Sequence, residues 1–137
     1  MIYDIGWEGY QTLLGLLGDR SIRMTYDRGN LELVAPLIIH ERYKKLLGRM
    51  VKAITEELDI PAVAAGATTF QREDLDRGLE PDECYYLANA GRLRDTQRID
   101  LTFDPPPDLA IEVEIAASAL KRLGIDTAPA FMLYLFQ

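Results

Sequence analysis

The chain has 137 residues, of which 48% are hydrophobic and 27% charged, and its formal net charge is −7. Composition and length are those of a soluble globular protein with one core, and they exclude a disordered or collagen-like chain. No apolar run is long enough to cross a bilayer, and we expect no secretion signal. The single Cys84 excludes an internal disulfide and fits a reducing cytoplasm. We therefore expect one cytoplasmic domain over residues 1–137, with an atypical tail over 124–137.

The amino-terminal part changes from a helical to a strand period. Residues 7–17 carry apolar side chains at spacings of three and four, which predicts a short amphipathic helix. Residues 22–26 and 31–35 then alternate between apolar and polar side chains. The intervening Asp-Arg-Gly-Asn sequence favours a turn, so this part of the chain predicts a β-hairpin.

The clearest helix opens at His40 and runs to about Leu58. One stripe of this helix is apolar and consists of Tyr43, Leu46, Leu47, Met50, Val51, Ile54 and Leu58. The opposite face is basic, and such faces are more often solvated than bound to phosphate. His40 stands where a histidine could carry protons or orient a metal-bound water, although most single histidines at helix starts do neither.

The second half of the chain contains two predicted strands that carry acids. Residues 63–70 are small and predict an additional strand, and residues 71–78 read as a charged loop. The first acidic strand is predicted over 83–87, followed by a polar surface loop over 89–104. The second is predicted over 109–115, where aliphatic residues alternate with acidic ones.

Carboxylates lie at or inside both acidic strands. Pro81 restricts the backbone before it to extended geometry and so places Asp82 at a strand mouth. Glu112 and Glu114 share one strand face, about 7 Å apart. Carboxylates from two adjacent strands could hold magnesium or manganese for phosphodiester hydrolysis. An ordinary amphipathic strand with solvated glutamates is the competing interpretation.

The order of these motifs resembles one known family. A helix, a hairpin ending in proline, His-Glu opening a helix, Gly-Leu-Glu-Pro-Asp-Glu-Cys-Tyr-Tyr and Pro-Pro-Pro-Asp-Leu-Ala-Ile-Glu-Val-Glu-Ile together resemble the Uma-two endonucleases of the PD-(D/E)XK superfamily. The resemblance covers about residues 6–125. It implies an α/β restriction-endonuclease-like core with a mixed sheet flanked by helices. It also implies Asp82 and Glu112 as ligands of Mg²⁺ or Mn²⁺, a recurrent histidine at His40, DNA as the nucleic-acid partner, and a homodimer.

The sequence departs from this family's pattern after the second acidic strand. Glu114 stands where the superfamily has lysine, and the family's register places Arg122, next to Lys121, at the alternative lysine position. Arginine can stabilise phosphate but does not exchange protons as lysine does. The apolar tail replaces an expected glycine-valine strand, and we hypothesise a shift of reading frame near Gly124. The tail itself either packs as a strand or exposes an apolar patch.

These patterns predict a metal-dependent endonuclease and leave open whether its activity is impaired. The predicted catalytic residues are Asp82, Glu112, Arg122, Lys121 and His40, with Glu114 of second rank. The alternative is a non-catalytic binding or assembly module that keeps the fold, and a third possibility is a nonfunctional remnant that binds metal without cleaving DNA.

Overall fold

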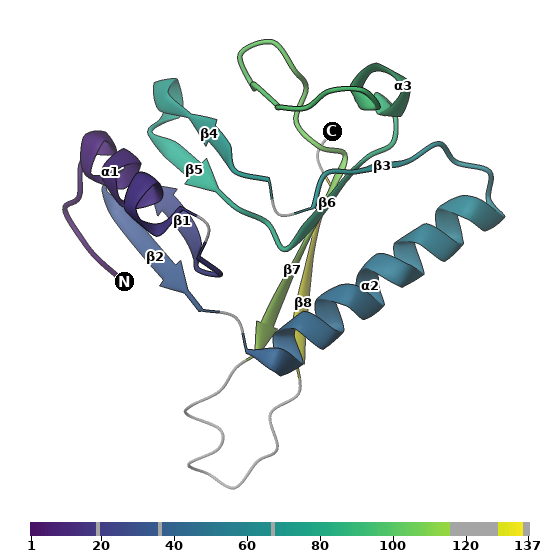
Figure 1. Cartoon of the computed structure of the whole chain (residues 1–137), viewed down its shortest axis with the longest axis horizontal. Coiled ribbons are helices and arrows are strands. Elements are labelled where there is room, and N and C mark those ends of the chain that lie inside the picture. Colours follow the sequence, from purple (N-terminus) through teal and green to yellow (C-terminus); the bar gives the residue numbers. More distant parts are fainter. Residues whose placement is uncertain (19, 36, 67, 116–128, 136–137) are drawn as a thin grey trace, which may run out of the picture. The chain divides into compact units, whose positions relative to one another are not determined.

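The computed structural model describes residues 1–18, 20–35, 37–66, 68–115 and 129–135 (Figure 1). Contacts group the chain into two compact units, each built around one four-stranded sheet. The first unit comprises Met1–Pro36, Thr68–Glu80 and Gln97–Pro106, and the second comprises Leu37–Ala67, Pro81–Thr96 and Pro107–Gln137. Among the helices in these ranges, none combines the length and apolar character needed to span a membrane.

The first unit contains one helix and a sheet in the order β2-β1-β5-β4. Its elements are α1 (Trp7–Leu17), β1 (Arg23–Asp27), β2 (Asn30–Val34), β4 (Phe70–Arg72), the 3₁₀ turn η1 (Glu73–Leu75) and β5 (Arg77–Leu79). The predicted helix and hairpin are confirmed. The hairpin turns at Arg28 and Gly29, both with positive φ, which is the geometry that matches the twist of paired strands.

An aromatic cluster forms the core of this unit. The rings of Tyr10 and Tyr26 stack with centroids 4.7 Å apart, and Trp7 meets both rings edge-on. Gly78 pairs with Tyr26 across β1 and β5, and a Cβ atom there would collide with the Tyr10 ring. Glycine at this position therefore lets α1 lie close to the sheet.

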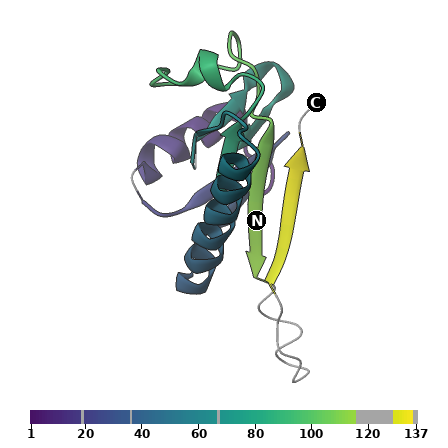
Figure 2. The same cartoon turned by 90° about the vertical axis from the view of Figure 1, so that its right-hand side faces the viewer.

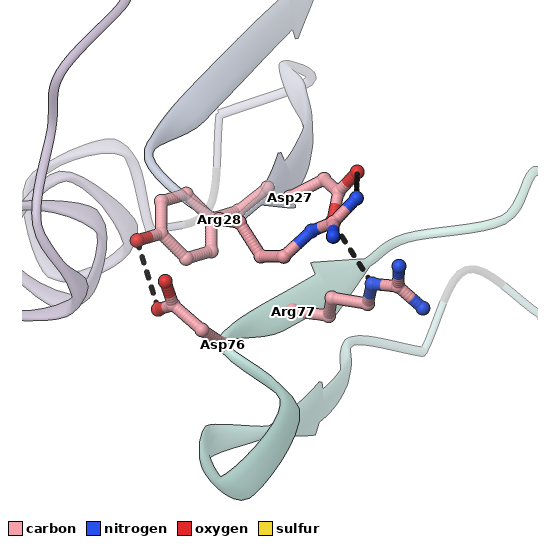
Figure 3. A network of polar contacts seen from close by, with 5 residues as sticks. Asp27, Arg28, Asp76 and Arg77 are labelled. Atoms are coloured by element: carbon pink, nitrogen blue, oxygen red, sulfur yellow. Dashed lines mark hydrogen bonds and ion pairs between the residues drawn. The ribbon is translucent and has the colours of Figure 1, made fainter.

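Polar side chains link the two inner strands of the same sheet, β1 and β5. Arg28 Nε lies 3.0 Å and Arg77 Nε 2.9 Å from Asp27 Oδ1, and Figure 3 draws these three residues together. The Tyr26 hydroxyl lies 2.9 Å from Asp76 Oδ1, just before β5. These contacts connect the β1–β2 hairpin to β5 through exposed ion pairs at Asp27 and through the buried Tyr26.

The second unit packs one long helix against a sheet in the order β3-β6-β7-β8. Its elements are α2 (Ile38–Glu57), β3 (Val63–Ala64), β6 (Glu83–Tyr86), α3 (Ala90–Leu93), β7 (Leu109–Ile115) and β8 (Pro129–Leu135). Figures 1 and 2 show α2 lying along β7, and β8 running beside β7 over its whole length. Strands β6 and β7 supply buried residues of its core: Cys84, Tyr85, Tyr86, Ala110, Ile111 and Val113.

The fold class predicted from the sequence is confirmed, since sheets and flanking helices form a restriction-endonuclease-like α/β arrangement. Within the described residues every strand pairing is antiparallel, where a mixed sheet was expected. The two acidic strands are confirmed as β6 and β7. Residues 129–135 form β8, so the tail packs as a strand, one of the two alternatives.

Two local predictions were wrong. Residues 63–70 do not form one strand, because β3 ends at Ala64 and Phe70 begins β4 in the other sheet. Residues 71–78 are not a loop, since they form most of the β4–β5 hairpin. Alanine and threonine fit a strand but do not specify its length, and the charged residues of a two-stranded edge look like a loop in sequence.

The apolar stripe of α2 also differs from a simple core-facing stripe. Leu46, Met50 and Ile54 are 50%, 51% and 53% exposed. The helix residues that are buried are His40 and Thr55. The face of α2 that is buried in the unit therefore carries polar residues.

Candidate functional site

Asp82 is a buried carboxylate at the start of β6. It is 1% exposed, and its Oδ2 accepts a hydrogen bond of 2.7 Å from the Val113 amide of β7. The ladder between β6 and β7 ends at the pair Glu83 and Ile111, two residues before that amide. The side chain of Asp82 thus takes the place of a backbone acceptor where the ladder stops, and this fixes the orientation of the carboxylate.

His40 contacts the same oxygen from α2. Its Nε2 lies 3.1 Å from Asp82 Oδ2, and its ring is 4% exposed. A carboxylate can only accept, so a hydrogen bond to ionised Asp82 requires the proton on Nε2. The other ring nitrogen, Nδ1, lies 3.5 Å from Glu41 Oε1. The first turn of α2 and the β7 backbone therefore both contact the same oxygen of Asp82.

Glu112 lies on β7 where the ladder register meets Asp82. Glu83 pairs with Ile111, so continuing this antiparallel register by one residue sets Asp82 across from Glu112. Glu112 is partly buried. The structure thus brings two of the predicted site residues, Asp82 and Glu112, to the same end of the sheet, together with His40.

Two further carboxylates and a lysine lie at this end of the unit. Lys44 Nζ lies 3.7 Å from Glu41 Oε2, and it also interacts with Glu83. The Tyr85 phenol also interacts with the Glu83 carboxylate. Burial raises the pKa of Glu83, an effect that Lys44 partly opposes and that Asp82 and Glu41 reinforce.

The pKa of Tyr85 responds to the same surroundings. Burial, followed by the charge of Glu83, raises the pKa of Tyr85 to about 12. The phenol therefore stays protonated at neutral pH and remains available as a donor to Glu83.

Three predicted residues find no structural test. Lys121 and Arg122 lie outside the described residues. Glu114 is placed in β7 by its backbone pairing with Ala130 of β8. Over the described parts of the chain, no three histidine, cysteine, aspartate or glutamate side chains form a group that could hold a metal ion by themselves.

An antiparallel strand pair that carries a buried aspartate near a glutamate, backed by a helix, is the arrangement expected of a restriction-endonuclease-like protein. The family model described as Uma2, putative restriction endonuclease, matches residues 7–135, and the chain belongs to this family. The match continues past residue 125 and includes β8. Comparison with curated proteins found no match. Comparison with solved structures found none either.

The residues that sequence reasoning missed are Glu41, Lys44 and Glu83. The sequence singled out no role for Lys44, whose side chain is 21% exposed and lies beside Glu41. A signal was present in the spacing, since His40 and Lys44 are one helical turn apart and so share a face. Only the contact between His40 and Asp82 shows that this face of α2, rather than the apolar stripe, meets the site.

Proposed function

We propose that this protein is a metal-dependent endonuclease that hydrolyses phosphodiester bonds in nucleic acid, with DNA as its substrate. The observation that carries the proposal is the buried Asp82 carboxylate, oriented by the Val113 amide and set across the strand register from Glu112. Membership of the Uma2 family supports the same reaction class.

The donor set fits a hard divalent cation of the magnesium type. Such ions prefer oxygen ligands and usually take one or two carboxylates, completing their shell with waters and substrate phosphate oxygens. Asp82 and Glu112 would supply those carboxylates.

The metal ligands and His40 have distinct roles in this proposal. When bound, the cation supplies a water of lowered pKa and neutralises charge on the phosphoryl group. Asp82 and Glu112 would hold this cation. His40 is a positioning residue, because it contacts Asp82 Oδ2 and restricts the carboxylate to one orientation. The fixed carboxylate needs no reorganisation when substrate arrives.

Plasmid cleavage in magnesium or manganese tests the proposal. Asp82→Asn and Glu112→Gln keep the size of each side chain and remove its charge, so both should abolish cleavage. Asp27→Asn in β1 and Glu32→Gln in β2 are matched controls in the other unit and should cleave as the wild type does. Cleavage that survives both Asp82→Asn and Glu112→Gln would remove the site assignment.

A calorimetric titration with manganese separates the alternatives. Heat of binding that is lost in Asp82→Asn, together with cleavage, supports the nuclease. Manganese binding without cleavage of any DNA or RNA substrate supports a remnant that keeps the site. Absence of manganese binding in the wild type supports a binding or assembly module that keeps only the fold.

A further inference from the structure

One row of α2 faces β6 at the candidate site. His40, Lys44 and Gly48 follow each other at intervals of four residues, so they lie along one side of the helix. His40 at one end contacts Asp82, and at the other end the Tyr85 hydroxyl lies 3.1 Å from the position of a Cβ on Gly48. Lys44 lies between these contacts and so faces Glu83, which follows Asp82 in β6.

The charges around Lys44 are mostly negative. Glu41 lies 3.7 Å from its ammonium group, Glu83 interacts with it, and Asp82 and Glu112 stand at the same end of the sheet. A phosphate that approached these four carboxylates would be repelled. Lys44 is the basic side chain that the described contacts bring to this end, and its limited exposure keeps its charge less screened by water.

We propose that Lys44 is the cation that contacts substrate phosphate at this site, an inference that rests on the proposed nuclease function. Its ammonium is a point charge with three donors on a flexible stem, so it can turn from Glu41 and Glu83 to a phosphate oxygen. Divalent-cation binding at Asp82 and Glu112 would reduce the negative potential there and favour that exchange.

A purely structural role is the competing explanation. Lys44 would then only balance the half-buried Glu83 carboxylate and Glu41. The two roles predict different effects of a second substitution added to Lys44→Gln. Replacing Glu83 by glutamine removes the charge that needs balancing, so it compensates for a structural loss but not for the loss of a phosphate contact.

The salt dependence of DNA binding tests the proposal. A fluorescent DNA duplex is titrated with protein in calcium, which replaces magnesium and holds back cleavage, at several salt concentrations. Lys44→Gln should reduce the slope of log affinity against log salt by about 0.9, the value for one lost phosphate contact, and Lys44→Arg should restore it. Lys45→Gln is the matched control, because Lys45 is the exposed neighbour on the same helix, and it should retain the slope.

Cleavage and metal binding complete the test. Lys44→Gln should cleave about 100-fold more slowly while its manganese affinity stays near that of the wild type, and Lys44→Gln with Glu83→Gln should remain equally slow. Circular dichroism checks that each variant is folded.

Three results overturn the inference. If Lys44→Gln matches Lys45→Gln in slope and rate, Lys44 makes no phosphate contact, and the nuclease proposal still stands. If Glu83→Gln restores the activity of Lys44→Gln, the role of Lys44 is structural, and the nuclease proposal again stands. A wild type that binds no duplex overturns both proposals. A wild type that binds but does not cleave, with the slope still lowered in Lys44→Gln, supports the phosphate contact and contradicts only the nuclease.

Discussion

Two aspartates, one in each unit, show how different a carboxylate can be in the same chain. Asp27 lies on the surface of the first unit between two arginine side chains, with Arg77 Nε 2.9 Å from Oδ1 (Figure 3). Asp82 in the second unit is 1% exposed and is held by a backbone amide and a histidine. Arginine neutralises the first carboxylate, whereas the second is oriented by hydrogen-bond contacts to His40 and the Val113 amide.

The difference separates a structural carboxylate from a candidate ligand. An exposed ion pair gains little free energy because water screens it and the side chains lose freedom. A buried carboxylate costs free energy unless its contacts are well formed, and such a cost is typical of functional sites. The comparison therefore directs the search for chemistry to the second unit, and variants can test it.

The largest expected effect is on folding stability at Asp82. Replacing it with alanine leaves the Val113 amide without its acceptor and His40 without its carboxylate, which should lower the free energy of unfolding by about 2 kcal/mol. Asp27→Ala should change it much less, because that carboxylate is exposed. Urea denaturation of both variants measures the difference, and equal losses would contradict the contrast drawn between the two sites.

A second comparison uses two buried polar residues of α2. His40→Ala removes a contact to Asp82, 42 residues away, and should cost about 1.5 kcal/mol of unfolding free energy. Thr55→Ala should cost less than 1 kcal/mol, because the Thr55 hydroxyl bonds only back to the Val51 and Lys52 carbonyls of its own helix. Thermal unfolding gives the ranking. A larger loss in Thr55→Ala would mean that the His40 contact contributes little.

Two stacked tyrosines of the first unit should respond in opposite ways to loss of their hydroxyls. Tyr26→Phe removes a hydroxyl within hydrogen-bond distance of Asp76 and the Ile5 carbonyl, and should cost about 1 kcal/mol. Tyr10→Phe should be neutral or stabilising, since that hydroxyl is buried without a hydrogen-bond partner among the described residues. Denaturant midpoints test this, and a clear loss in Tyr10→Phe would show that its hydroxyl is bonded in solution.

The smallest effect is the pH dependence that Asp27 adds. Hydrogen bonds from Arg28, and then from Arg77, hold the pKa of Asp27 below its usual 3.8. The folded state therefore binds this proton less readily, so the stabilisation is present above pH 3.8 and is lost as pH falls through the lowered pKa. The difference in stability between wild type and Asp27→Asn should shrink in that acidic range. A difference that stays constant from pH 6 to about pH 2 would contradict it.

The sequence predicted those parts of the fold in which local pattern and tertiary role agree. The first helix, the hairpin and β7 have clear periods, and Pro81 correctly placed Asp82 at a strand start. The β4–β5 hairpin was missed because Gln71 to Gly78 is held by pairing to β1 rather than by its own apolar pattern.

The sequence named candidate residues for the site but not the contacts between them. Asp82, Glu112 and His40 were named from motif and resemblance. A single Asp82 oxygen contacts both His40 and the Val113 amide. This arrangement depends on where β6 stops pairing with β7, which no local pattern encodes. Lys44 was overlooked for the same reason, since the face of α2 that meets the sheet is set by tertiary contacts.

The unequal lengths of β6 and β7 have a consequence for self-association. Strand β6 pairs with residues 109–111 of β7, while β8 pairs with all seven residues of that strand. Beyond residue 111, β7 has no ladder partner on its β6 side among the described residues, so local opening there would present a sheet edge to which a foreign strand could add. The Val113 amide there already donates its hydrogen bond to the Asp82 carboxylate. The proposed metal ligand thus also discourages strand addition, and variants made to remove catalysis would be expected to aggregate more readily than the wild type.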